Sequence, residues 1–407
     1  MGRTRALDDA LPATGRLRVL DGLRFVAAVA VVLFHFTGRD SIAWPEGVRE
    51  VFPFLSRITV YGGFGPYLFF MISGFVVLMS AWGRPVHSFV ASRVGRLYPA
   101  YWAAVLLTAA VLFLNQGLID RWGSLGPSGV AMNLTMFQSA FGVPHVDGVF
   151  WTLWVELKFY VLLALLAMAG ITQGRLLALC LVWPVAGALA AQAGSPLLVA
   201  ALEPVYAPFF CIGILLYLVH REGWSVSTGL LLALNYCFAL YTCSSYFVPW
   251  TLGVAGSGIS FRGTAVLLTL SILAIGLATL TRLDRLDWRW LTFLGALTYP
   301  LYLVHQVPGW VLIHRVAPVL PAYVTVGLVL VVVLAAAYLV HRFVERPVGG
   351  RLRRAVERDL ARNGARTPRS RHDAAVPSSR AVPPLPVARV PDGSVAGHAA
   401  HRETASA

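Results

Sequence analysis

Charged side chains are scarce in this sequence of 407 residues: they make up 13% of the chain, whereas hydrophobic residues make up 57%. The mean hydropathy of +0.69 is too high for a water-soluble enzyme. Cysteine is rare as well. The four cysteines lie in apolar segments without a CxxC spacing, so they indicate neither a disulfide framework nor a zinc site. We therefore expect a membrane protein whose functional site holds no metal ion.

Acidic residues are outnumbered by basic ones, 19 to 33, and lysine occurs once, at Lys158. In a soluble protein a net charge of +14 would suggest a nucleic-acid partner. Here the arginines gather in the terminal segments and in short loops, which is the distribution that orients a membrane protein with its positive ends in the cytoplasm. We expect both termini to be cytoplasmic and no nucleic acid to bind.

Long apolar runs fill the region between the termini. About ten of them are long enough to cross the roughly 30 Å of hydrocarbon in a bilayer. The predicted ranges are 19–38, 60–80, 98–116, 150–170, 175–193, 202–220, 228–247, 264–281, 291–314 and 320–343. The sequence thus predicts an all-α polytopic integral membrane protein with about 10 transmembrane helices. We expect no cleavable signal peptide, because the first run is full length and lacks a small-residue cleavage pattern.

Changes in composition divide the chain into three regions. Residues 1–16 form a cytoplasmic N-terminal segment, 17–347 one membrane domain, and 348–407 a basic, Pro/Ala-rich and mostly disordered cytoplasmic tail. The arginines of the tail either contact anionic lipid headgroups or stay solvated. The longest outer loop, roughly 117–149, is too apolar for easy disorder, and we expect it to re-enter the membrane in part or to cover a site.

Three polar residues interrupt the first apolar run, RVLDGLRFVAAVAVVLFHF: Asp21, Arg24 and His35. An ionisable residue inside a span is costly and normally faces a cavity or a partner. Arg24 and His35 are eleven residues apart, so on a helix they share one face, roughly 16 Å apart along the axis. This geometry predicts a polar path from the cytoplasm. The alternative is that Arg24 only reaches the membrane surface and His35 makes one interhelical hydrogen bond.

The fourth span opens with FWTLWVELKFY and carries Glu156 about a turn from its start. We expect this carboxylate to lie near the depth of His35, where it would fix the tautomer of the imidazole and help it to take a proton from a hydroxyl group. Alternatively, Glu156 pairs with Lys158 or faces outer water.

Two arginines stand together at the cytoplasmic end of the third span, in SFVASRVGRLYPAYW. Arg93 and Arg96 are neighbours on a helical turn and could bind a phosphate through bidentate contacts. The alternative is ordinary positive-inside topology. Elsewhere, FFMISGFVV places Ser73 inside the second span, in a packing or a catalytic role, and YPLYLVHQ places His305 deep in the ninth span, where we expect it to face the polar interior.

Together these segments resemble the bacterial membrane acyltransferase family called acyltransferase 3. The resemblance rests on the order and spacing of Arg24 and His35, FFMISGF, the RxxR of Arg93 and Arg96, WTLWVELKFY, YPLYLVHQ and FVERP, and covers about residues 18–347. It implies an O-acyltransferase of the bacterial plasma membrane that transfers an acyl group, expected to be acetyl, from acyl-CoA to a hydroxyl group of a glycan or a glycosylated small molecule such as a macrolide.

The resemblance also implies roles for single residues. His35 matches the essential histidine of the family and Arg24 its basic partner. Arg93 and Arg96 match the arginines that engage coenzyme A, and Glu156 matches the acidic residue of the fourth-span motif. We expect His35, Glu156 and His305 to be catalytic, and Arg24, Arg93, Arg96 and Ser73 to bind the donor. The sequence departs from the family pattern at Thr152, Lys158 and the pair Pro66 and Tyr67, which leaves the acceptor open.

A polytopic transporter of an acylated glycan or metabolite is the alternative to an enzyme, because intramembrane charges and a polar path also describe a permease. An inverted repeat would favour transport, and none is visible in the sequence.

Overall fold

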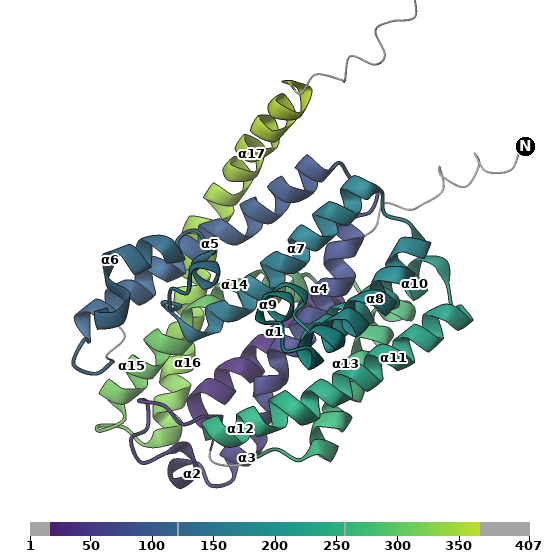
Figure 1. Ribbon diagram of the computed structural model, residues 1–407. Coiled ribbons are helices and arrows are strands. Elements are labelled where there is room, and N and C mark those ends of the chain that lie inside the picture. The colour runs from purple at the N-terminus through teal and green to yellow at the C-terminus, as the bar shows by residue number, and fades with distance from the viewer. Residues whose placement is uncertain (1–16, 120–121, 256–257, 367–407) are drawn as a thin grey trace, which may run out of the picture. The chain divides into compact units, whose positions relative to one another are not determined.

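The computed structural model describes residues 17–119, 122–255 and 258–366. Throughout these residues the chain is built from helices and the turns that join them, and it forms no β-strand (Figure 1). The all-α fold predicted from the sequence is therefore confirmed. In its first half the elements are α1 (Arg18–Leu33), η1 (Phe34–Gly38), α2 (Val48–Val51), α3 (Leu55–Thr59), η2 (Val60–Phe64), α4 (Gly65–Ala81), α5 (Val86–Leu114), α6 (Trp122–Asn133), η3 (Gln138–Phe141), η4 (Gly148–Phe150), α7 (Trp151–Ala169) and α8 (Gln173–Gln192).

The second half continues in the same way. Its elements are α9 (Pro196–Leu202), α10 (Ala207–Glu222), α11 (Val226–Thr242), η5 (Cys243–Phe247), α12 (Val248–Ala255), α13 (Phe261–Leu280), η6 (Arg282–Arg285), α14 (Arg289–Val304), α15 (Gln306–Val316), α16 (Ala322–Val340), η7 (His341–Glu345) and α17 (Arg346–Arg366). Several helices begin at a hydroxyl side chain that accepts a hydrogen bond from a free N–H of the first turn. Ser225 caps α11 through the N–H of Thr228 in this way, and Ser260 caps α13 through that of Gly263.

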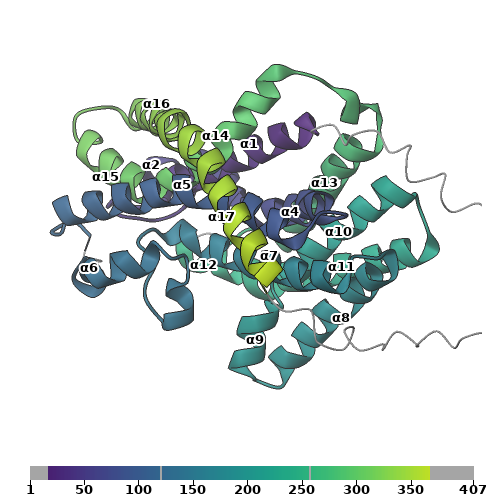
Figure 2. The ribbon, with the colours of Figure 1, turned by 90° about the horizontal axis from the view of Figure 1, so that it is seen from above.

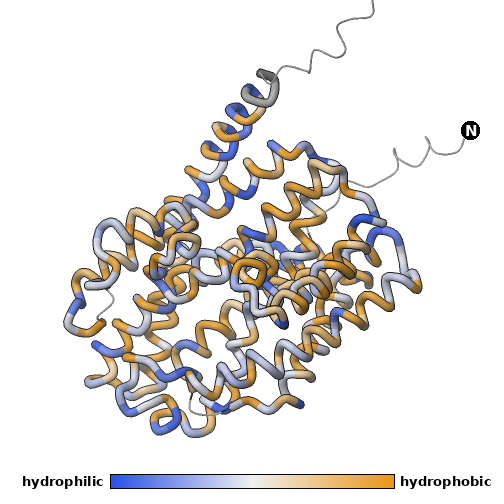
Figure 3. The backbone as a smooth tube through the Cα atoms, viewed as in Figure 1, coloured by the Kyte–Doolittle hydropathy of each residue, from blue (hydrophilic) through white to orange (hydrophobic). Residues whose placement is uncertain are grey.

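Nine helical stretches within the described residues are long and apolar enough to cross a membrane. Figure 3 shows that apolar residues prevail along these helices, and many of the large ones are exposed, as expected for side chains that face lipid. The stretches are Arg18–Gly38, Leu55–Ala81, Val86–Leu114, Gly148–Ala169, Gln173–Gln192, Pro196–Glu222, Val226–Ala255, Phe261–Leu280 and Ala322–Arg362. The protein is a multi-pass membrane protein.

The predicted ninth span, 291–314, is not one helix. It is divided into α14 and α15, and the break falls at His305. The physical reason is Pro308, which has no N–H to donate to the carbonyl oxygen of Val304, so the helical hydrogen-bond ladder stops there. Proline at this position was visible in the sequence, but prolines inside membrane helices often leave the span continuous. Pro99, Pro184 and Pro300 all lie inside unbroken helices of this protein.

Close helix packing at the centre of the bundle depends on small residues. α4 lies against α10, and α1 lies against α14 (Figure 2). A β-carbon added at Gly74 would lie 2.2 Å from the carbonyl oxygen of Phe210, and one added at Gly213 would lie 2.0 Å from that of Met71. The α4 and α10 backbones therefore touch at these glycines, as small residues permit in membrane bundles. This contact fixes α4, which carries Ser73 into the site.

The long loop after α5 and the C-terminal region also have defined structure. Within the loop, the side-chain oxygen of Asn133 accepts a hydrogen bond from the N–H of Val146 at 3.0 Å, and Trp102 of α5 donates to the carbonyl oxygen of Leu134 at 3.0 Å. After α16 the chain stays helical through α17, a continuation that the sequence had not predicted. The predicted segment 1–16 and the remainder of the predicted tail, 367–407, lie outside the described residues.

Candidate active site

His35 lies where the first helix changes its winding. The α-helical turns of α1 give way to the π-helix η1, whose wider turn alters the usual pairing of backbone carbonyls. Two indole N–H groups bind backbone carbonyl oxygens of this turn. Trp310 donates to the carbonyl oxygen of His35 at 2.8 Å, and Trp44 donates to that of Phe36 at 2.8 Å. These bonds fix the backbone that carries the imidazole of His35, which is buried and 7% exposed.

The partner of this imidazole is His305. Nε2 of His305 lies 3.2 Å from Nδ1 of His35, and the two rings meet edge to face with centroids 5.0 Å apart. Nδ1 of His305 lies 2.8 Å from the carbonyl oxygen of Tyr302 and 3.2 Å from that of Leu301. Because carbonyl oxygens only accept, Nδ1 of His305 carries the hydrogen, and in the neutral ring Nε2 is then an acceptor.

The same reasoning assigns the tautomer of His35. Its Nδ1 faces two acceptors, Nε2 of His305 and the carbonyl oxygen of Val31 at 2.9 Å. Nδ1 must therefore carry the hydrogen, and Nε2 of His35 keeps its lone pair. Of the four ring nitrogens of His35 and His305, Nε2 of His35 has no hydrogen-bond partner among the described residues, and its lone pair can act as a base.

The helix break at His305 is held by a buried carboxylate that the sequence analysis did not single out. Asp147 is fully buried and precedes η4. Its Oδ1 accepts from the N–H of Val149 at 3.2 Å, and its Oδ2 accepts from the N–H of Val307 at 3.1 Å, in the first turn of α15. One side chain thus caps two helices. The sequence signal for it was weak: an aspartate just before a glycine and an aromatic run.

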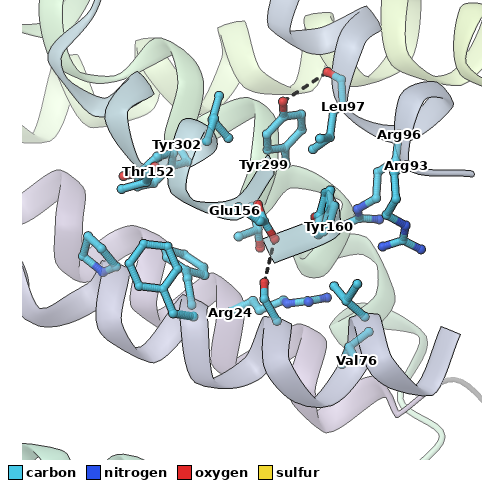
Figure 4. A pocket seen from close by; sticks show the side chains of 17 residues that line it. Arg24, Val76, Arg93, Arg96, Leu97, Thr152, Glu156, Tyr160, Tyr299 and Tyr302 are labelled. Atoms are coloured by element: carbon cyan, nitrogen blue, oxygen red, sulfur yellow. Dashed lines mark hydrogen bonds between the residues drawn. The ribbon is translucent and has the colours of Figure 1, made fainter. Parts of the chain in front are cut away.

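Three arginines line a cavity of about 160 Å³. Arg24 enters it from α1, and Arg93 and Arg96 enter it from α5, one turn apart (Figure 4). None of the ion pairs among the described residues includes any of the three. The guanidinium of Arg93 lies 5.7 Å from the ring centroids of Phe89 and Tyr160, which support it from the side. We name this space the arginine cavity.

Glu156 and Ser73 also line the arginine cavity. The hydroxyl of Ser73 donates to Oε1 of Glu156 at 2.7 Å (Figure 4). With three guanidiniums and one carboxylate, the cavity keeps a positive balance of two charges. Such a surplus attracts an anionic ligand.

The expectation that Glu156 orients His35 does not agree with this geometry. Glu156 lies in the arginine cavity, whereas His35 lies in a different cavity and is oriented by His305. The reason is depth: the fourth span begins at η4, and Glu156 lies two turns further along it than Gly148, which borders the cavity of His35. The alternative pairing with Lys158 is not seen either. Lys158 forms an ion pair with Glu203 and donates to the carbonyl oxygen of Ala200 at 2.8 Å.

His35 lines a larger cavity of about 450 Å³, which we name the histidine cavity. Aromatic side chains form much of its wall; they are Phe34, Tyr67, Trp151, Tyr206, Tyr246, Trp250, Tyr302 and Trp310. Its polar groups include Arg39, whose guanidinium lies 5.5 Å from the ring centroid of Trp310, and Gln306. Neither residue was among the predicted site residues, although Gln306 follows His305 directly.

The two cavities share Pro66 and Tyr302 as lining residues. At this junction the hydroxyl of Thr152 lies 3.0 Å from that of Tyr302 and 2.9 Å from the carbonyl oxygen of Val149. Thr152 stands where the family pattern has serine, and the hydroxyl that reaches Tyr302 is present in both residues. Few residues therefore separate the arginine cavity from the histidine cavity, and a slender ligand group could extend from one to the other.

Comparison with known proteins agrees with the motifs. The sequence model of a family described as Acyltransferase domain matches residues 17–341. The chain belongs to the acyltransferase 3 family. One relative is Acyltransferase MdmB of Streptomyces mycarofaciens, which is 30% identical over 154 residues; the match covers 37% of this chain and 38% of that protein. No solved structure matches.

Membership confirms the resemblance predicted from the sequence. The family and the relative are both described as acyltransferases, and the enzyme class predicted from the sequence is an acyltransferase that transfers groups other than amino-acyl groups. The match ends at residue 341, so α17 lies beyond it. Within the match lie every predicted site residue and both cavities.

Proposed function

We propose that this protein is an O-acyltransferase of the bacterial plasma membrane, which transfers an acyl group, such as acetyl, from acyl-CoA to a hydroxyl group. The observation that carries the proposal is the meeting of the arginine cavity and the histidine cavity at Pro66 and Tyr302. One compartment suits an anionic donor and the other holds an oriented base. Family membership supports the reaction class.

The arginine cavity suits the phosphates of coenzyme A by charge and the pantetheine arm by size. The phosphates suit guanidinium groups, which bind them through paired hydrogen bonds. Arg96 is exposed, so it can hold a phosphate at the mouth, while Arg24 and Arg93 lie further in. A volume of about 160 Å³ is too small for the nucleotide but suits the narrow pantetheine arm. The thioester would then reach the junction at Tyr302.

His35 would act as the general base. Its Nε2 takes the proton of the acceptor hydroxyl as the oxygen attacks the thioester carbon, so that the new C–O bond forms and the C–S bond breaks. The thiolate of coenzyme A leaves and receives the proton from the imidazolium. His305 accepts the Nδ1 hydrogen of His35 and stabilises the charge that develops on the ring. His305 is therefore a positioning residue in this mechanism.

The acceptor would occupy the histidine cavity, and we propose a carbohydrate or a glycosylated natural product such as a macrolide. The aromatic wall supports this class, because the C–H faces of a sugar ring pack well against flat rings such as those of Trp250 and Trp151. We place both termini in the cytoplasm, which puts the arginine cavity on the cytoplasmic side, where acyl-CoA is made.

Purified protein in nanodiscs with radiolabelled acetyl-CoA tests the proposal. Wild type should release coenzyme A and transfer label to a hydroxyl acceptor, and His35→Ala should lose both activities while its melting temperature and its binding of coenzyme A persist. A wild-type protein that neither binds nor consumes acetyl-CoA would refute the donor assignment and favour transport of a metabolite through the two cavities.

A further inference from the structure

The side chain of Gln306 is buried without a partner. It is 3% exposed, and its Oε1 has no hydrogen bond. No hydrogen bond from its amide nitrogen to any described residue exists either, and the side chain lines the histidine cavity together with His35. A buried amide without hydrogen-bond partners destabilises the folded protein. A group retained at such a cost beside a catalytic base points to a ligand that pairs with it.

Ser73, Tyr299 and His305 are other potential donors to a negative charge near the reaction, and each is already engaged. Ser73 gives its hydrogen to Glu156 at 2.7 Å, and Tyr299 gives its hydrogen to the carbonyl oxygen of Leu97 at 3.1 Å. Both ring nitrogens of His305 are also occupied, as described above. The N–H₂ group of Gln306, by contrast, is a neutral donor that lies in the cavity of His35 and has no acceptor among the described residues.

The backbone that carries this amide is held on both sides. Val307, the next residue, is held by the carboxylate of Asp147, and His305, the preceding residue, contacts His35. Opposite the amide lies Gly148, where a β-carbon would come within 2.8 Å of Oε1 and 3.0 Å of Nε2 of Gln306. Because Gly148 has no side chain, the amide of Gln306 fits into this space. Preorganised donors of this kind stabilise a transition state without reorganising.

We propose that the amide N–H of Gln306 donates a hydrogen bond to the thioester carbonyl oxygen as it becomes the oxyanion of the tetrahedral transition state. The inference rests on the proposed function. Attack by the acceptor oxygen moves the carbonyl electron pair onto the oxygen, where Gln306 meets it. His35 holds the hydroxyl proton until the C–S bond breaks and the thiolate takes it.

The test compares Gln306→Glu with wild type in thiol release from acetyl-CoA, with water alone and with methyl glycosides as acceptors. Glutamate has the size of glutamine but a carboxylate in place of the donor. We expect both reactions to fall by the same factor of about 10²–10³, with the KM for acetyl-CoA within about threefold of wild type. Gln116→Glu, an exposed site with the same change of charge, is the matched control, and Gln306→Met repeats the loss of the donor without adding charge.

The outcomes separate the possibilities. Loss of transfer with unchanged hydrolysis would mean that Gln306 binds the acceptor, and would overturn the inference. Equal hydrolysis by wild type and both Gln306 variants, with melting temperatures unchanged, would also overturn it while leaving the proposed function intact. Absence of turnover and of donor binding in the wild type would instead refute the proposed function, and the inference with it.

Discussion

Asp147 and Val307 are 160 positions apart in sequence, and Oδ2 of the aspartate accepts the backbone N–H of Val307 at 3.1 Å. The bond joins the start of the fourth span to the point where α14 and α15 separate. His305 and Gln306 immediately precede Val307, so this carboxylate sets the backbone from which two residues of the candidate site extend.

Replacing Asp147 by asparagine should reduce catalysis more than its effect on stability explains. Asparagine keeps one acceptor oxygen, so one of the two caps is lost, at a cost of about 1–2 kcal/mol of unfolding free energy. We expect the kcat for thiol release from acetyl-CoA to fall by about tenfold or more, because His305 and Gln306 shift. Ser260→Ala, which removes the cap of α13 away from both cavities, should lower the melting temperature and leave kcat unchanged. A kcat of Asp147→Asn equal to wild type would contradict the proposed positioning role.

Replacing His305 should change kcat and leave the binding of acyl-CoA alone. The imidazolium of His35 that forms during the reaction would lose a charge-assisted hydrogen bond of about 1.5–3 kcal/mol in His305→Leu, which is roughly 10- to 150-fold in rate. His305→Gln places an amide oxygen near the lost Nε2 and should recover much of that rate. The measurement is kcat and KM for acetyl-CoA in the three proteins. A purely structural role for His305 predicts no rescue by glutamine.

Replacing an arginine of the arginine cavity should lower the affinity for coenzyme A. Arg93→Gln and Arg96→Gln should each weaken binding of coenzyme A by about tenfold or more, since each removes hydrogen bonds from a charged donor to a phosphate. Binding to wild type should weaken with added salt, and less steeply in the variants. Arg84→Gln is the control, because Arg84 is an exposed residue of the short loop before α5. Calorimetry in nanodiscs at two salt concentrations gives all of these values. If Arg84→Gln weakened binding as much as the others, the effect would come from surface charge in general.

Much of the fold could be read from the sequence because apolar runs of sufficient length have few alternatives in a bilayer. The division of the ninth span could not. Pro308 stands just after the break while Pro99 lies inside an unbroken helix, and the N–H of Val307, next to Pro308, is bound by Asp147 from a distant segment.

The candidate site shows the same limit. Arg93 and Arg96 are three residues apart, so the helical period alone places them together. The partner of His35 required a tertiary contact between residues 270 positions apart. Glu156 was the plausible acid by sequence, but it accepts a hydrogen from Ser73 in the arginine cavity. The depth of Glu156 in the membrane can be counted from the sequence only when the start of the fourth span is known. In the structure that span begins with η4.

The contact of α4 with α10 gives a prediction about stability that does not depend on the proposed reaction. In Gly213→Ala the new methyl group would lie 2.0 Å from the carbonyl oxygen of Met71, so the two helices must separate. Overpacking of this kind costs about 1–3 kcal/mol, and the melting temperature in detergent should fall. Gly229→Ala makes the same change in the interior of α11, where no atom lies within 4 Å of the added carbon. There alanine should raise stability by about 0.5–1 kcal/mol, since glycine weakens a helix interior. Equal melting temperatures for the two variants would show that the α4 and α10 backbones are not in contact.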